Sequence, residues 1–200
     1  MHFEYTRASR DLQDRFDTRR LADRLADVKV HDVFTPEDRA FIERLDMFFL
    51  ATVGESGRPT CSYKGGDPGF VSVIDERTIA FPSYDGNGMY LSMGNVAATR
   101  AVGLLFIDFE QQRRMRVDGS ARIDFAHPLL TRHPEAQLLV VVEAERIYPN
   151  CGRYIHEYEL VERSRFVPRP DRPTPVPGWK QSDWAPDVLP AGDPARRDDR

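Results

Sequence analysis

The amino-acid sequence predicts a mainly β protein with peripheral helices, built as a closed or nearly closed antiparallel barrel. From Met47 onward, short apolar or β-branched segments alternate with glycine-rich turns, which is the pattern of short strands joined by tight connections. Nine of the thirteen glycines lie between Gly54 and Gly103, so the turn residues belong to this block and not to a linker. Short strands at this spacing favour a barrel.

Length and composition restrict the class of protein. Two hundred residues are enough for one substantial core. A content of 40% hydrophobic and 30% charged residues is too apolar for a disordered chain and too polar for a membrane protein. No apolar run approaches the roughly 20 residues that a bilayer span needs, and the N-terminal region contains no apolar signal segment. We therefore expect a cytoplasmic protein without membrane contact.

Charge and cysteine content argue against two further classes. The chain has 28 basic and 32 acidic residues and a formal charge of -4, which provides no general basic field for nucleic acid. Its two cysteines, Cys61 and Cys151, form no CxxC or other metal-ligand spacing. We expect two reduced thiols packed in or near the core, and no metal site.

Residues 1–45 are predicted to form an N-terminal helical extension. Apolar residues recur at helical spacing among interleaved charges: Leu12, Phe16, Leu21, Leu25 and Val28. This predicts one amphipathic helix over residues 7–29, docked by the apolar stripe; a basic helix for RNA or a membrane surface is less favoured because aspartates neutralise its field. A second helix is predicted from Thr35 as N-cap and Pro36 as first helical residue, ending near Leu45.

The barrel is predicted to occupy residues 46–165. The expected strands are residues 48–53, 59–65, 70–74, 78–81, 102–109, 114–125 and 138–147, with a further extended segment at 154–161 and a short helix at 127–137. Residues 166–200 form a proline-rich C-terminal tail, which contains eight of the fifteen prolines and both tryptophans. We expect it to lack regular structure and either to stay extended or to wrap across a neighbouring surface.

One strand carries a polar face that suits an oxygen-rich anion. The period of two places Thr60, Ser62 and Lys64 on one face, and Cys61 and Tyr63 on the other. A solvated face of an ordinary hairpin is the alternative.

A glycine-rich loop follows the next strand. After Pro82 and Ser83, the sequence around Asn87 leads into a segment that can form a helix over residues 89–98. Unpaired N–H groups at a helix start bind phosphate. The alternative is a simple tight turn at Asn87.

Arg114 and Arg116 are predicted to share one strand face about 7 Å apart, where an anion or water would reduce their repulsion. A plain surface pair remains as an alternative. Together, the three polar features fit one phosphorylated aromatic ligand. The sequence contains no GxSxG, no complete GxGxxG and no Walker-type loop, which leaves a hydrolase triad or a Rossmann site without support.

Four stretches carry a resemblance to a known family: FFLATVGESGRPTCSYKGG, IAFPSYDGNGMYLSMGN, VGLLFID and RMRVDGSARI. From about Phe48 to Val161 the chain resembles the pyridoxamine 5'-phosphate oxidase-like family of FMN-binding split barrels, and the later YPNCGRYIHEYE resembles the same region in an uncharacterised branch. The resemblance implies a homodimer of six-stranded antiparallel split barrels, with FMN in the groove between protomers.

The resemblance also implies cofactor-binding residues. It places Lys64 at a basic phosphate contact, Arg114 at the polar edge of the flavin ring, and Ser92 on a phosphate loop. The implied contacts are Cys61, Ser62, Tyr63, Lys64, Pro82, Ser83, Ser92 and Arg114; local chemistry adds Asn87, Asn95 and Arg116.

Two departures separate the chain from the oxidase proper. Pro59 stands where the oxidase has an arginine and Ser92 where it has a lysine, and the proline-rich tail has no counterpart of the substrate-binding arginine and histidine. We therefore do not expect pyridoxamine phosphate oxidation.

The expected function is an FMN-dependent oxidoreductase that transfers hydride through flavin N5 to or from a small molecule, with a reduced nicotinamide as a candidate donor. No catalytic residue is identified. The alternatives are a deazaflavin-dependent reductase, and a non-catalytic flavin or haem protein that uses His127, His133 or His156. An interaction protein with an empty barrel is the least specific alternative.

Overall fold

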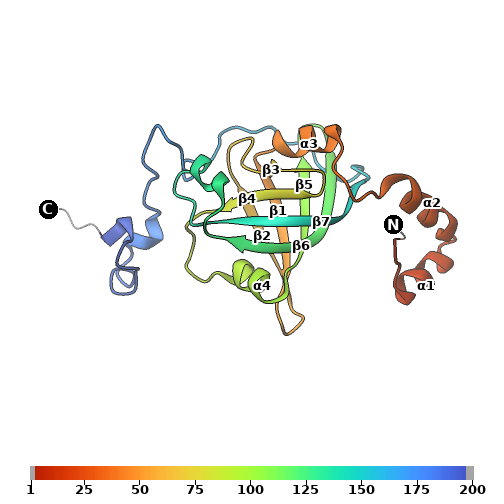
Figure 1. Cartoon of the computed structure of the whole chain (residues 1–200), viewed down its shortest axis with the longest axis horizontal. Helices are drawn as coiled ribbons and strands as arrows, with labels where there is room; N and C mark the ends of the chain where they lie inside the picture. Colours follow the sequence, from red (N-terminus) through yellow and green to blue (C-terminus); the bar gives the residue numbers. More distant parts are fainter. Residues whose placement is uncertain (1–2, 197–200) are drawn as a thin grey trace. The chain divides into compact units, whose positions relative to one another are not determined.

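The computed structural model describes residues 3–196 and divides the chain into two compact units, the first ending at Leu160 and the second beginning at Val161 (Figure 1). The first unit contains one seven-stranded sheet. Its strands are β1 Met47–Val53, β2 Pro59–Gly65, β3 Ser72–Val73, β4 Thr78–Ser83, β5 Ala101–Asp108, β6 Arg113–Asp124 and β7 Leu138–Asn150. Every neighbouring pair is antiparallel, in the order β2-β1-β5-β6-β7-β4-β3.

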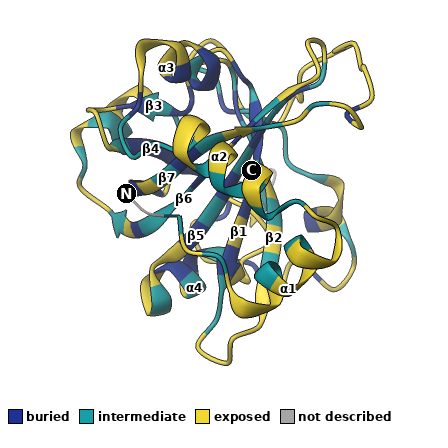
Figure 2. Ribbon diagram, turned by 90° about the vertical axis from the view of Figure 1, so that its right-hand side faces the viewer, coloured by how far each residue is buried: buried dark blue, intermediate teal, exposed yellow. Residues whose placement is uncertain are grey.

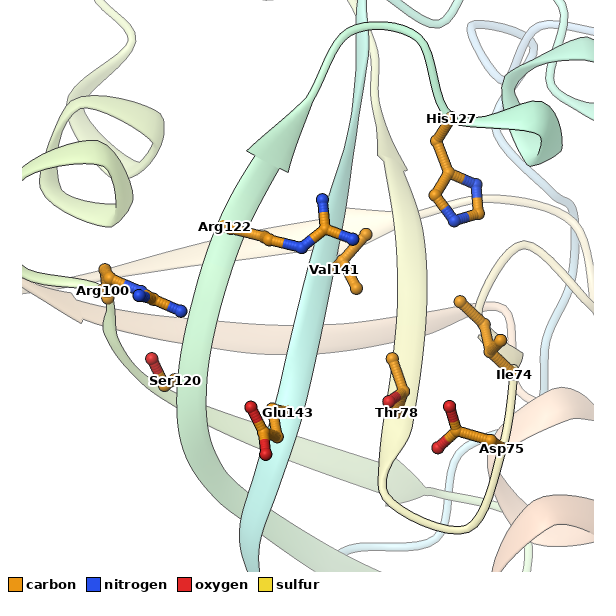
Figure 3. Close-up of a pocket in the computed structure, with 9 residues that line it drawn as sticks. All are labelled: Ile74, Asp75, Thr78, Arg100, Ser120, Arg122, His127, Val141 and Glu143. Carbon is orange, nitrogen blue, oxygen red and sulfur yellow. The ribbon is translucent and has the colours of Figure 1, made fainter.

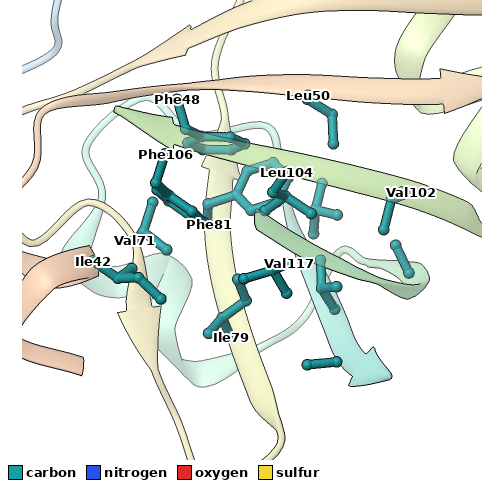
Figure 4. Packing of buried hydrophobic residues seen from close by; sticks show 14 of the residues in the cluster. Ile42, Phe48, Leu50, Val71, Ile79, Phe81, Val102, Leu104, Phe106 and Val117 are labelled. Carbon is teal, nitrogen blue, oxygen red and sulfur yellow. The ribbon is translucent and has the colours of Figure 1, made fainter. Parts of the chain in front are cut away.

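The sheet curls on itself into a split barrel. Phe48 of β1 and Phe81 of β4 are separated by three strands in the sheet order, yet their rings meet edge to face with centroids 4.9 Å apart (Figure 4). The inner face of the sheet therefore encloses a single core. The end strands β2 and β3 are not neighbours in the sheet, and the barrel is split between them. The predicted fold class is confirmed.

The core is built from inward residues of six strands, all except β2. Phe48, Leu50, Leu104, Phe106 and Val117 are almost completely buried. Burial of each such side chain contributes roughly 1.5 to 3 kcal/mol to folding. This close-packed centre fixes which face of every strand is turned inward.

The barrel has seven strands and not the six that the family resemblance implies. The additional strand is β3, whose Ser72 and Val73 pair with Ala80 and Ile79 of β4. A turn closed by the Ile74 N–H and the Thr78 carbonyl, 2.8 Å apart, returns the chain at once. Only two residues therefore line up with β4, so the strand expected at residues 70–74 is present but shorter than predicted.

A β-bulge divides β7 into two parts of opposite alternation. Asp118 of β6 pairs with Arg146, whereas Gly119 pairs with Ala144, so Glu145 is the extra residue. The bulge lets both Ile147 and Ala144 point inward. A Cβ atom at position 119 would lie 2.1 Å from the carbonyl oxygen of Glu143, so only glycine fits there.

The N-terminal region forms two helices, α1 Arg7–Arg15 and α2 Arg19–Lys29, where one helix was expected. Asp17 has a left-handed φ of 52°, which ends the first helix and turns the chain into a hairpin. The expectation that the apolar stripe docks is also wrong: Phe16 is 68% exposed, and neither helix has a buried residue (Figure 2). The helical spacing of the apolar residues correctly predicts helix in this region, but it does not show whether another part of the chain covers the apolar face.

The remaining helices of the first unit lie against the barrel. Helix α3, Pro36–Glu43, buries Phe41 and Ile42 in the core, and helix α4, Leu91–Thr99, buries Met93 and Val96. The predicted helix at 127–137 is reduced to a 3-10 turn, η1 Pro128–Arg132. Residues 154–161 form no strand. Among the residues described, none of the helices is both long and apolar enough to cross a membrane.

The second unit is proline-rich and has two 3-10 turns, η2 Gly178–Gln181 and η3 Pro194–Arg196. Lys180 and Asp193 form an ion pair of 2.6 Å, with side chains only 5% and 6% exposed. Trp179 and Trp184 stack with ring centroids 6.0 Å apart. This internal packing is not predictable from local sequence patterns, because the two charged residues lie thirteen positions apart in an irregular segment.

We predict that Thr35→Ala destabilises the first unit by about 1 kcal/mol. The Thr35 hydroxyl accepts a hydrogen bond from the Asp38 N–H and donates one to the Asp38 carboxylate, and the alanine variant loses both. The hydrogen bond from the backbone N–H of residue 35 to the same carboxylate remains. Urea unfolding followed by circular dichroism measures the loss. Thr35→Ser keeps the hydroxyl and is expected to lose much less; equal losses in the two variants would contradict the capping role.

Candidate functional site

A cavity of about 370 Å³ lies where β2, the end of β4 and the start of α4 come together. Its volume is within the range of small-molecule sites. Most of the residues that line it have polar side chains: Thr60, Cys61, Ser62, Lys64, Ser83, Tyr84, Gly86, Asn87, Gly88, Tyr90, Leu91, Ser92 and Met93.

The polar face of β2 is turned to the inner side of the sheet. Lys64 pairs with Phe48, and Ser62 pairs with Leu50, two of the most deeply buried residues of β1. Directly opposite residues of an antiparallel pair point to the same side. The inner face of β1 is covered by the core. Strand β2 lies at the end of the sheet, and its inner face meets the cavity and α4 instead.

Lys64 is the charged group of the cavity. Burial lowers the pKa of its ammonium group, because desolvation disfavours the charged form. In the described part of the chain, no carboxylate lies within ion-pair distance of it. A partly desolvated cation without a counter-charge suits an anion supplied from outside.

The start of α4 adds hydrogen-bond donors next to Lys64. The hydroxyl oxygens of Ser62 and Ser92 are 3.1 Å apart, which joins β2 to the first turn of the helix. Tyr90, the N-cap residue, has a left-handed φ of 49° and provides no side-chain cap. The first N–H groups of α4 therefore lack intrahelical acceptors, at the positive end of the helix dipole.

Asn95 holds α4 in place beneath the cavity. Its side-chain amide donates to the hydroxyls of Thr52, at 3.0 Å, and Thr60, at 3.3 Å. The Thr99 hydroxyl donates to the carbonyl of Val53 at 2.7 Å, one turn further along the helix. These bonds fix the helix against β1 and β2.

Tyr84 contributes a second kind of donor. Burial raises the pKa of its phenol to about 12, with a smaller contribution from the nearby Asp67 carboxylate. The phenol therefore keeps its proton at neutral pH. Tyr90 is held at the rim of the cavity, since its hydroxyl donates to the side-chain oxygen of Gln137 at 2.9 Å.

The structure brings together six of the eleven residues that the sequence analysis proposed for the cofactor: Cys61, Ser62, Lys64, Ser83, Asn87 and Ser92. Asn95 lies one turn deeper and bonds the threonines. Two lining residues, Thr60 and Tyr84, stand outside those eleven, although Thr60 belongs to the polar strand face predicted to suit an anion. Thr60 shares the face of Ser62 and Lys64, which was a usable signal; Tyr84 is placed by a loop, for which no periodicity exists.

Four proposed residues do not line this cavity. Tyr63, Arg114 and Arg116 alternate with inward residues and lie on the outer face of the sheet, where Tyr63 meets Phe49 edge to face at 6.1 Å. Pro82 lies between the inward residues of β4 and points away from the cavity. Within one chain, these four residues therefore do not face the same cavity as Lys64.

Arg114 has one polar atom without a partner. Its Nε atom is buried and makes no hydrogen bond, and the Oδ1 atom of Asn150, its cross-strand partner, is in the same state. Buried polar atoms without partners cost free energy. This part of the outer face is suited to a hydrogen-bonding partner.

Both cysteines are exposed, contrary to the expected packing in or near the core. Cys61 lies on an end strand and Cys151 just beyond the end of β7, so neither position has a covering layer. Hydrogen bonds from the Arg153 backbone and side chain lower the pKa of the Cys151 thiol. Within residues 3–196, no three histidine, cysteine or acidic side chains come close enough to hold a metal ion.

The chain is therefore an antiparallel split barrel with a cavity suited to an anion beside its end strand β2. A family model described as pyridoxamine 5'-phosphate oxidase matches residues 34–151, which is more than half of the chain, and the chain belongs to this family. No curated protein sequence matches the chain.

Solved structures that resemble the chain are distant in sequence. A putative pyridoxamine 5'-phosphate oxidase from Lactobacillus delbrueckii is 18% identical, with coverage of 60% of this chain and 99% of that chain and a TM-score of 0.49. An FMN-binding protein from Syntrophomonas wolfei is 13% identical, with coverage of 71% and 97% and a TM-score of 0.46. HutZ, the heme storage protein from Vibrio cholerae, is 17% identical, with coverage of 57% and 93% and a TM-score of 0.42.

Proposed function

We propose that this protein is an FMN-dependent oxidoreductase, and that the cavity beside β2 binds the phosphate end of the cofactor. The observation that carries the proposal is Lys64, a partly buried cation with no ion-pair partner among residues 3–196, which faces the same cavity as Ser62 and Ser92. Membership of the pyridoxamine 5'-phosphate oxidase family supports the choice of flavin.

The donor set fits a phosphate. Lys64 supplies a charge-assisted hydrogen bond, and the Ser62, Ser92 and Thr60 hydroxyls supply neutral ones. The first N–H groups of α4 add the positive end of a helix dipole. Ser92 stands where the oxidase has a lysine and Pro59 where it has an arginine, so the charge on the anion is balanced by one lysine and the helix end.

When bound, FMN supplies hydride transfer at N5, and the protein supplies binding and orientation. Lys64 and the serines bind the phosphate end, while Tyr84 keeps a protonated phenol in the cavity. We propose a small-molecule substrate and a reduced nicotinamide as electron donor. The same proposal places the protein in the cytoplasm, with residues 46–165 as the cofactor-binding part.

We also propose a homodimer in which each protomer completes the cofactor site of its partner. Arg114 and Arg116 lie on the outer face, whereas Lys64 lies on the inner face, so one chain cannot bring them to the same ligand. The buried Nε of Arg114 lacks an acceptor. A flavin held by the partner would provide carbonyl groups for it, and the guanidinium would stabilise negative charge on the reduced ring.

The first experiment is the absorption spectrum of the purified protein after incubation with FMN. We expect a bound flavin spectrum that anaerobic NADH or NADPH bleaches, because a hydride donor reduces a catalytically competent flavin. A haem band, a deazaflavin band, or a bound flavin that neither nucleotide reduces would contradict an NAD(P)H-linked flavoenzyme.

Lys64→Ala is expected to weaken FMN binding by roughly 10- to 150-fold, since it removes a charge-assisted contact of about 1.5 to 3 kcal/mol. Fluorescence titration with FMN measures the change. Lys29→Ala removes an exposed lysine at the end of α2 and serves as the matched control, with no expected change. Equal affinities of the Lys64→Ala variant and the wild type would remove Lys64 from the site.

A mixed dimer tests the contribution of the partner. In a dimer of one Lys64→Ala chain and one Arg114→Ala chain, one site carries both changes and the other carries neither. We expect tight FMN binding at one site in two, whereas both parent variants bind weakly at both sites. Differently tagged, co-expressed chains provide the sample. If the mixed dimer binds no better than its parents, Arg114 does not serve the partner's cofactor.

A further inference from the structure

A second cavity lies on the outer face of the sheet and belongs to no site described so far. It has a volume of about 270 Å³ and is formed over β6, β7 and the start of β4 (Figure 3). It shares no lining residue with the candidate cofactor cavity. Its charged groups are two arginines and two carboxylates, and one histidine also faces it. We refer to it as the outer cleft.

The strand register arranges the floor of the outer cleft in two rows. Ser120, Glu143 and Thr78 stand opposite one another on β6, β7 and β4. Two residues further along, Arg122 stands opposite Val141. The rows are about 7 Å apart along the strands. One row therefore carries a carboxylate in its centre, and the other carries a guanidinium beside an apolar residue.

Arg100 is held at the edge of the cleft in an unusual backbone conformation. It ends helix α4 with a left-handed φ of 63°, at a position where glycine is the common residue. The Ala121 N–H donates to its carbonyl oxygen at 2.7 Å, which ties it to β6. Its guanidinium has no ion-pair partner within the described residues.

His127 adds a donor to the same side. Its Nδ1 atom accepts a hydrogen bond from the Leu129 N–H at 3.2 Å. In the neutral ring the proton is then on Nε2, and the ring extends toward the cleft (Figure 3). Arg122 and His127 form the donor side, and Arg100 lies at the other end of the cleft, beside Ser120 (Figure 3).

The opposite side carries two carboxylates. The Arg77 N–H donates to the Asp75 carboxylate at 2.8 Å and lowers its pKa, so this group is ionised at neutral pH. Glu143 is exposed and makes no side-chain ion pair or hydrogen bond in the described structure. Ile74, which is 40% exposed, and Val141 supply apolar surface between the charged groups.

The two sets of charges do not neutralise each other. No guanidinium of the cleft lies within 4 Å of Glu143 or Asp75; instead Arg122 bonds Asp124 at 2.8 Å. The Asp75 carboxylate is held by its bond from the Arg77 N–H, and the Arg122 guanidinium by its bond to Asp124. A ligand with both charges can bridge this separation.

We propose that the outer cleft binds a free amino acid with an aliphatic side chain. Its carboxylate binds Arg122 and the Nε2–H of His127, and its ammonium group binds Glu143 and Asp75. Its side chain contacts Ile74 and Val141. A ligand with only a carboxylate would leave Glu143 and Asp75 without a cation. A ligand with only an amine would leave the arginine and histidine donors without an anion.

L-leucine is the probe, measured by isothermal titration against the full chain. Isocaproate has the same skeleton without the amine, and isoamylamine has it without the carboxylate. We expect saturable leucine binding, with both analogues at least tenfold weaker. This comparison uses wild-type protein only and does not depend on whether a variant folds. The absence of saturation by leucine up to roughly 10 mM, or equal binding of all three compounds, would overturn the proposal.

Two pairs of variants locate the binding. Arg122→Gln and Glu143→Gln are each expected to weaken leucine by tenfold or more. The matched controls are Arg132→Gln, an exposed arginine of η1, and Glu145→Gln, the exposed residue of the bulge. Neither control lines the cleft, and neither is expected to change the affinity. If the controls weaken leucine as much as the cleft variants do, binding is not in the outer cleft.

Discussion

The candidate cofactor site depends on the fact that the curled sheet ends at β2. The inner face of every central strand is covered by the core, but β2 has no further neighbour, so its inner face meets open space and one helix. Polar side chains at Ser62 and Lys64 are tolerated there because they face this space and not the phenylalanine core. Helix α4 is kept at the right height by Asn95, whose amide bonds Thr52 and Thr60. Because Lys64 faces this space, no carboxylate of the described residues lies close enough to pair with its ammonium group.

The outer face is organised by a different local feature. Because Glu145 is an extra residue in β7, the residues on either side of it alternate in opposite phase. Val141 and Glu143 point outward as a result, while Val142 and Ala144 fill the core. Gly119 on the facing strand allows the close backbone approach that this bulge needs. One inserted residue thus places both an apolar and an acidic group on the exposed side of the sheet.

Much of the fold could be predicted because its signals are local. Alternation along β2 and the cap at Thr35 follow from covalent geometry and short-range hydrogen bonds, and both are present in the structure. What could not be predicted depends on contacts distant in sequence. Arg114 and Lys64 each have a clear strand face, but only the curl and register of the sheet decide that these faces are opposite. The break at Asp17 is likewise a single backbone angle that hydrophobic spacing does not record.

Helix α4 has nine residues and a length of about 13 Å, and its two ends border different cavities. The first turn borders the cofactor cavity through Ser92, whereas the last residue before β5, Arg100, borders the outer cleft. Because a helix of this length is stiff, any shift along its axis would displace Ser92 and Arg100 together. The position of helix α4 therefore affects the cofactor cavity and the outer cleft together.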